Sequence, residues 1–131
     1  MPAPSSFDYA VIRIVPHVER GEFINVGIIL FCRTRRFLGA KVELDRQRLA
    51  ALAPHFDIDK AAAHLELIPR TAEGNSSPIG SLDQAERFHW LVTPRSTSIQ
   101  VSEVHTGLCY DPQSALEHLM EKMVRVEEGE S

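Results

Sequence analysis

Residues 7–44 decide the fold: they read FDYAVIRIVPHVERGEFINVGIILFCRTRRFLGAKVEL. The stretch holds three apolar runs, at 7–15, 24–32 and 37–44, and their β-branched and aromatic residues predict strands. Only the polar segment HVERGEF and the basic turn RTRR join these runs. Because short connections join antiparallel neighbours, the three strands are expected to form a meander.

Two details of the meander bear on its position in the fold. The runs 7–15 and 24–32 are apolar on both faces, with Arg13 and Asn25 among the few polar exceptions. This pattern is typical of inner strands. Gly27 lies inside the second run, where a glycine indicates a bulge or the close approach of another backbone.

The rest of the chain predicts helices and one further strand. Helices are expected from Asp45 to about Ala53, from Asp57 to about Ile68, over 82–92 after a capping box at Ser81, and after Asp111-Pro112. The β-branched stretch 97–102 predicts a fourth strand. The expected class is therefore α+β, an antiparallel sheet of about four strands with helices packed on one face.

Length and composition favour one ordinary globular domain. The chain has 131 residues, of which 44% are hydrophobic and 24% charged, with a net charge of −4. These values exclude disordered, collagen-like and disulfide-rich classes. A disordered leader is expected at 1–6, one domain at 7–126 and an acidic tail at 127–131.

The N-terminus lacks the pattern of a signal peptide, and no apolar run is long enough to span a membrane. We therefore expect a cytoplasmic protein that is not associated with a membrane. The two cysteines, Cys32 and Cys109, are expected to be reduced. Neither lies in a metal-binding spacing, so no metal or other cofactor is expected.

Two polar segments are candidates for binding. Arg95-Ser96-Thr97 precedes a strand, where a guanidinium and two hydroxyls can hold a phosphate or carboxylate; the alternative is a loop whose hydroxyls bond to its own backbone. Glu19, Arg20 and Glu22 form a charged loop that fits either acid–base work or a solvated connection with surface ion pairs.

Single polar residues complete the set of candidates. Asn25 interrupts an apolar strand, so it either ties down a loop backbone or lies beneath a ligand. His105 is a candidate base, and it stands four residues before Cys109. Arg33, Arg35 and Arg36 cluster on one turn, where they fit weak nucleic-acid binding or a charged, soluble sheet edge.

Several stretches together resemble the bacterial domain-of-unknown-function family 3037 over about residues 7–126. They are FDYAVIRIVPHVERGEFINVGIILFC at 7–32, RFLGA at 36–40, WLVTPRSTSIQ at 90–100 and VHTGLCYDP at 104–112. The matching polar and glycine positions are Glu19, Arg20, Glu22, Asn25, Gly27, Gly39, Arg95, Ser96, Thr97, Gln100, His105, Gly107 and Asp111.

The resemblance implies a small bacterial protein of no established activity. Some members of the family are encoded beside HipA-like kinase proteins, so the resemblance implies a protein partner, with a HipA-like kinase protein as the candidate. No P-loop, dinucleotide-binding, zinc-protease or serine-hydrolase motif occurs in the chain.

Two functions are therefore weighed. The first is a non-catalytic accessory domain that binds a protein partner through the loops at 17–23 and 93–97. The alternative is a small enzyme or ligand-binding protein acting on a phosphorylated or nucleic-acid substrate. In it Arg95 would clamp the anion, Ser96 and Thr97 would orient it, and Glu19 or His105 would act as base. That alternative requires these side chains to converge in one pocket.

Overall fold

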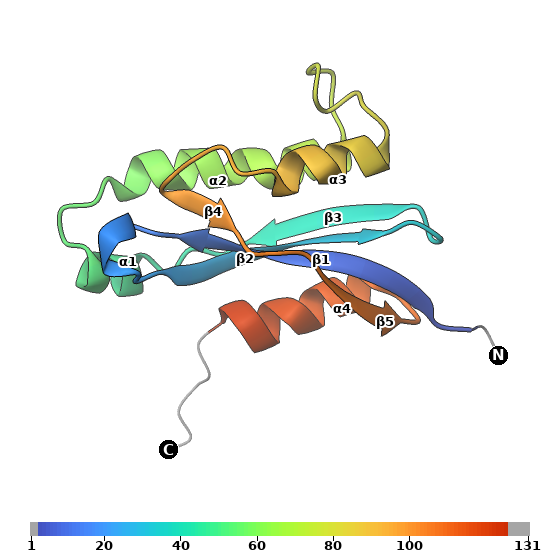
Figure 1. Cartoon of the computed structure of the whole chain (residues 1–131), viewed down its shortest axis with the longest axis horizontal. Coiled ribbons are helices and arrows are strands. Elements are labelled where there is room, and N and C mark those ends of the chain that lie inside the picture. The colour runs from blue at the N-terminus through green and yellow to red at the C-terminus, as the bar shows by residue number, and fades with distance from the viewer. Residues whose placement is uncertain (1–2, 126–131) are drawn as a thin grey trace.

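The computed structural model describes residues 3–125, in which the chain forms five strands and four α-helices (Figure 1). The elements are β1 (Ser5–Ile14), the 3₁₀ turn η1 (Val18–Arg20), β2 (Ile24–Cys32), β3 (Phe37–Val42), α1 (Arg46–Leu52), α2 (Ile58–Glu73), α3 (Gln84–Val92), β4 (Ile99–Val101), β5 (His105–Cys109), α4 (Pro112–Leu119) and the π-helical turn η2 (Met120–Val124). The tail expected at 127–131 and the first two residues of the expected leader lie outside the described residues.

The sheet confirms the predicted meander, because β2 pairs antiparallel with both β1 and β3. The strand order is β3-β2-β1-β4, and β5 also pairs with β1. Strand β1 is therefore central, with β2 on one side and the β4 and β5 segments on the other. It begins at Ser5, inside the stretch expected to be a leader, because Ser5 and Ser6 pair with Cys109 and Leu108 of β5.

Strand β5 was missing from the sequence-based prediction. Its residues, HTGLC, show no clear alternation of apolar and polar types, and the strand that it pairs with lies about a hundred residues away in the chain. Both β4 and β5 are antiparallel to β1. They act as one interrupted edge strand along the two halves of β1.

Ser102 joins the two halves of this edge. Its backbone N–H donates to the Val11 carbonyl at 2.9 Å, and its hydroxyl accepts the Val11 N–H at 2.9 Å. The same hydroxyl donates to the Glu103 carbonyl at 2.9 Å. Ser102 is buried. Its hydroxyl accepts the Val11 N–H in place of the backbone carbonyl that a continuous β-ladder would provide.

The bulge predicted at Gly27 is present. The register between β1 and β2 shifts where Ile12 pairs with Gly27 and Arg13 pairs with Asn25. A Cβ at Gly27 would lie 2.5 Å from the backbone oxygen of Lys41. The absence of a side chain therefore lets β3 approach β2 closely at this point.

The α+β class and the antiparallel sheet are confirmed, but helices cover both faces of the sheet instead of one (Figure 1). Helices α2 and α3 lie over one face, against Ile12, Ile29 and Phe31. Helix α4 and η2 lie over the other, against Val11 and Leu30. The physical reason is that β1 and β2 are apolar on both sides, so both sides need cover.

Helix starts largely follow the predicted caps. The carboxylates of Asp45, Asp57 and Asp111 each accept a backbone N–H of the first turn. Helix α3 differs: Asp83 caps it, accepting the Glu86 N–H at 2.9 Å, whereas the Ser81 hydroxyl donates to the Pro78 carbonyl. Helix α2 continues past Ile68 and Pro69 to Glu73, because its buried face continues to Ala72.

Candidate functional site

A groove of about 560 Å³ lies on the face covered by α2 and α3. We call it the α2–α3 groove. It is lined by His64, Leu67, Ile68, Arg70, Thr71, Asn75, Ser77, Ile79, Trp90, Leu91, Thr93, Pro94, Arg95, Ser96, Ile99 and Val101. The lining contains no carboxylate, and its charged or titratable groups are His64, Arg70 and Arg95.

Arg95 is the most prominent polar group of this groove. Its guanidinium carbon lies 3.6 Å from the centre of the Trp90 ring, a cation–π contact. Among the described residues, no carboxylate lies within ion-pair distance of it. Partial burial lowers the pKa of Arg95, but a guanidinium stays protonated at neutral pH. Trp90 therefore contacts a positive charge that has no carboxylate partner within residues 3–125.

Ser96, Thr97 and Gln100 build the turn that carries Arg95. The Ser96 hydroxyl accepts the backbone N–H groups of Ser98 and Ile99, each at 3.2 Å. The Gln100 side-chain amide donates to the Thr97 carbonyl at 2.7 Å. These bonds match the local-turn interpretation for the Ser96 hydroxyl. The exposed Arg95 guanidinium and Thr97 hydroxyl form no hydrogen bond with the described residues, so both are available to a ligand.

The charged loop at 17–23 forms a local ion pair. The Arg20 Nε donates to Glu22 Oε1 at 2.7 Å, and both side chains are exposed. This hydrogen bond lowers the pKa of Glu22 and raises that of Arg20. Glu19 lies exposed in the turn η1 beside them. None of the three residues lines the α2–α3 groove.

Asn25 and Gln100 come together through a residue that was not among the candidates. Arg13 pairs with Asn25 on β2 and with Gln100 on β4, so the three side chains form a row across the sheet. The Asn25 amide donates to the Met123 carbonyl at 3.0 Å, and the Arg13 guanidinium lies 4.5 Å from the centre of the Phe23 ring. The signal was Arg13 itself, a charge inside an apolar strand.

This row keeps two buried polar atoms without a protein partner, Arg13 Nε and Asn25 Oδ1. One is a donor and the other an acceptor, and their residues pair directly across two strands. The Asn25 side-chain N–H, by contrast, is bonded, and it fastens η2 to the sheet through the Met123 carbonyl.

His105 lies apart from the other candidates. It pairs with Tyr9 at the start of β5, and the two rings are 5.4 Å apart. Arg95, by contrast, belongs to the segment whose Ser98 carbonyl accepts the Val15 N–H. Tyr9 and Val15 are separated by six residues of extended chain, roughly 20 Å. The structure thus does not bring His105 to Arg95, and the convergence needed by the enzyme alternative is not observed.

The basic turn at 33–36 points its arginines to different neighbours. Arg33 lies over the Phe31 ring, 5.2 Å from its centre, and Arg35 donates to the Ser5 hydroxyl at 3.1 Å. Arg36 adopts a positive φ of 52° and its carbonyl accepts the Gln84 amide. The three residues close the β2–β3 hairpin; nucleic-acid binding by them stays a prediction.

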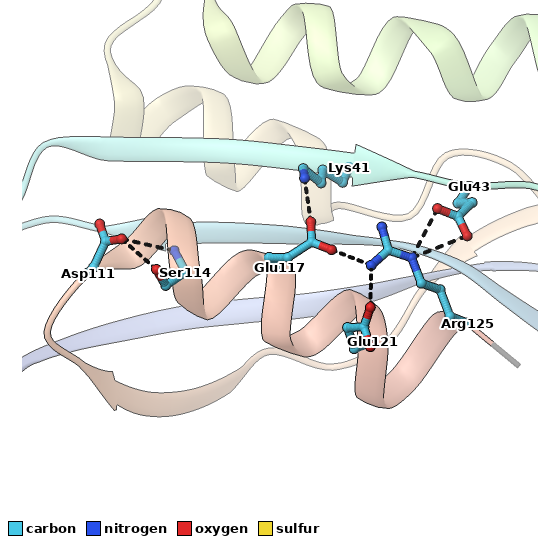
Figure 2. A network of polar contacts seen from close by, with 7 residues as sticks. All are labelled: Lys41, Glu43, Asp111, Ser114, Glu117, Glu121 and Arg125. Carbon is cyan, nitrogen blue, oxygen red and sulfur yellow. Dashed lines mark hydrogen bonds and ion pairs between the residues drawn. The ribbon is translucent and has the colours of Figure 1, made fainter. Parts of the chain in front are cut away.

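Arg125 provides a contrast to Arg95 on the opposite face (Figure 2). It forms ion pairs with Glu43, Glu117 and Glu121, and Lys41 also binds Glu117. These bonds lower the pKa of Glu117 to about 2, chiefly through Lys41 and then Arg125. Figure 2 shows the network joining β3 to α4 and η2. Its positive and negative side chains pair with one another within the chain.

Neither cysteine shows the features of a reactive thiol. Cys32 and Cys109 are free and buried in the core beneath α4. Burial raises the pKa of the Cys109 thiol, which disfavours the nucleophilic thiolate. Within residues 3–125, no three histidine, cysteine or acidic side chains gather as a metal site. No helix of this part of the chain has the length and apolarity needed to cross a bilayer.

Comparison with known proteins identifies a family, and that family has no described function. The model of a family described as "Protein of unknown function (DUF3037)" matches residues 9–124. Among curated proteins, secretogranin-2b of Danio rerio is 29% identical over 82 residues. The aligned part covers 61% of this chain but only 14% of that relative's length. No solved structure matches the chain at a significant level.

Proposed function

We propose that this chain, which belongs to the DUF3037 family of proteins of unknown function, is a binding domain without catalytic activity of its own. Its partner is a protein, bound in the α2–α3 groove. The observation that carries the proposal is Arg95, stacked on Trp90 at the edge of an apolar groove whose lining holds no carboxylate.

The chemistry of the groove specifies the segment that it fits. Leu67 on its rim is 54% exposed, and Ile68, Leu91 and Ile99 line its wall. An apolar groove between helices takes the apolar face of an amphipathic helix. His64, Arg70 and Arg95 favour acidic residues beside that face, because they are the titratable groups of the lining. The proposed ligand is thus an acidic, amphipathic segment of the partner.

The proposal also revises where the partner binds. Of the two loops singled out in the sequence, the segment at 93–97 borders the groove, through Thr93, Pro94, Arg95 and Ser96, whereas the loop at 17–23 does not. The dispersal of Glu19, Arg20, Arg95 and His105 favours binding over catalysis, since acid–base groups need a shared substrate within hydrogen-bond reach. We further propose a bacterial accessory role in the cytoplasm, with a HipA-like kinase protein as the first partner to test.

A photo-crosslinking experiment in the host cell tests the proposal. A photoreactive residue at Leu67 is expected to capture one protein, and Arg95→Glu is expected to abolish the capture. The matched control places the same group at Val18, which is 56% exposed but lies in the loop at 17–23 outside the groove. Capture at Val18 alone would contradict the proposed site.

The captured segment then gives a quantitative test. A synthetic peptide with its sequence is titrated against the purified chain, using the fluorescence of Trp90, the chain's single tryptophan. Arg95→Gln should weaken binding about tenfold or more, the loss of a charge-assisted contact, while Arg48→Gln, a surface change in α1, should not. A small anionic molecule recovered in the groove by native mass spectrometry, with no protein captured, would overturn the proposal in favour of a ligand-binding protein.

A further inference from the structure

Strand β5 is an uncovered sheet edge with an apolar stripe. One side of β5 pairs with β1, and in residues 3–125 no strand pairs with the other side. Leu108 is 70% exposed and Tyr110 is 63% exposed, and Val104, just before the strand, is 44% exposed. An open edge that carries apolar side chains pairs readily with another strand unless the sequence prevents it.

The two faces of β5 differ sharply. His105 and Cys109 face the α4 layer, where His105 contacts Tyr9 and Cys109 belongs to the core. Alternation then places Thr106 and Leu108 on the opposite face, and the exposed Tyr110 follows directly after the strand. Helices α2 and α3 pack over β2 and β3 and do not cover this part of the sheet (Figure 1). The stripe is therefore open to a partner that extends the sheet.

Natural sheets protect open edges with charged residues, and the two edges of this sheet differ in that respect. The outer strand β3 carries Lys41 and is followed by Glu43, both held in the network of Arg125. Between residues 104 and 110 there is no lysine, arginine, aspartate, glutamate or proline. Nothing in this stretch repels an identical strand.

We propose that β5 pairs antiparallel with β5 of a second copy of this chain, with the twofold axis at Leu108. This register places Leu108 against Leu108 of the second copy and Tyr110 against its Thr106. It also places His105 opposite Asp111 of the second copy, a favourable neighbour for a histidine. The register centred on Gly107 would instead put Glu103 opposite Asp111 of the second copy, two like charges that destabilise a cross-strand pair.

Mass measurement of the full chain tests the pairing. Light scattering at concentrations from about 1 to about 200 μM should show a rise toward twice the 14.7 kDa of one chain. Leu108→Lys should keep the protein monomeric across this range. Leu67→Lys, at a leucine in the α2–α3 groove that is 54% exposed, is the matched control and should leave the dimer intact. A wild-type chain that stays monomeric throughout, or a dimer that survives Leu108→Lys, overturns the proposal.

A cysteine scan tests the register. Residues that face each other across antiparallel strands have Cβ atoms about 4.5–5.5 Å apart. With a mild oxidant added, Leu108→Cys should form a covalent dimer, as two thiols lose two protons and two electrons to that oxidant. In the same register two Thr106→Cys residues lie roughly 13 Å apart and should not react. Equal crosslinking at both positions would overturn the Leu108-centred register.

Discussion

Arg95 and Arg125 lie on opposite faces of one sheet, and their guanidinium groups have different partners. Arg125 has three carboxylate partners and joins η2 to β3 and α4. Arg95 has an aromatic ring beneath it and, among the described residues, no carboxylate partner. In the first arrangement, carboxylates of the same chain balance the charge of Arg125. The second leaves an exposed positive charge beside an apolar groove, which is what the proposed acidic partner would bind.

The comparison extends to the layers around the two arginines. Helix α4 seals its face with a buried core that includes Leu116, 2% exposed. The groove between α2 and α3 leaves Leu67 54% exposed. We therefore expect substitutions on the α4 face to change stability and substitutions in the groove to change binding.

The largest effect is expected when leucines on the two faces are compared. Leu116→Ala should destabilise the fold by about 2–5 kcal/mol, because it empties a filled core site. Leu67→Ala should stay within about 0.5 kcal/mol of the wild type, since a surface change removes little packing. Urea unfolding of both variants measures the difference. Equal losses would show that the groove is part of the core and not a free surface.

The second prediction concerns Ser102, where the two halves of the outer edge strand meet. Ser102→Ala should cost about 1–3 kcal/mol, because the buried Val11 N–H loses its acceptor. Hydrogen exchange at the Val11 amide should accelerate, whereas exchange in β3 should change only with global stability. Ser102→Thr, which keeps the hydroxyl, is the control. An unchanged Val11 exchange rate in Ser102→Ala would mean that this bond does not secure the edge.

The smallest effect is expected when stability is measured as a function of pH. This measurement also distinguishes the two arginines most clearly. Glu117 has a folded-state pKa of about 2, below the ordinary value of 4.5. Its carboxylate therefore contributes stability that is complete above about pH 4.5 and is lost as the pH falls toward 2. Arg125→Gln should lower the unfolding midpoint at neutral pH and flatten this acid dependence. Arg95→Gln should leave both as in the wild type, and a parallel loss in Arg95→Gln would contradict the contrast.

Much of the fold follows from local sequence. The meander comes from three apolar runs, the caps from Asp45, Asp57 and Asp111, and the bulge from Gly27. The fifth strand could not be predicted locally, because HTGLC becomes a strand only by pairing with β1. The position of α4 also depends on tertiary structure: both faces of β1 and β2 are apolar, but the sequence does not say which helix covers which face.

The candidate site shows the same division. Arg95 was singled out from its segment, and of the two hydroxyls beside it that of Ser96 forms the local turn that was weighed as the alternative to ligand binding. The groove itself was not predictable, since its walls come from residues as distant as His64 and Val101. Arg13 was noticed as an exception in an apolar strand, but only the register of β2 and β4 shows that it links Asn25 to Gln100.

The central place of β1 has a consequence for synthesis on the ribosome. This strand is translated before the other strands of the sheet. The backbone groups on one of its two sides find their partners only when β4 and β5, in residues 99–109, have been translated. Until then the nascent meander exposes the open side of β1 and the apolar surface that α4 later covers. We expect the chain to complete its fold only after most of it has been translated, and translation arrested before β4 to leave an aggregation-prone intermediate.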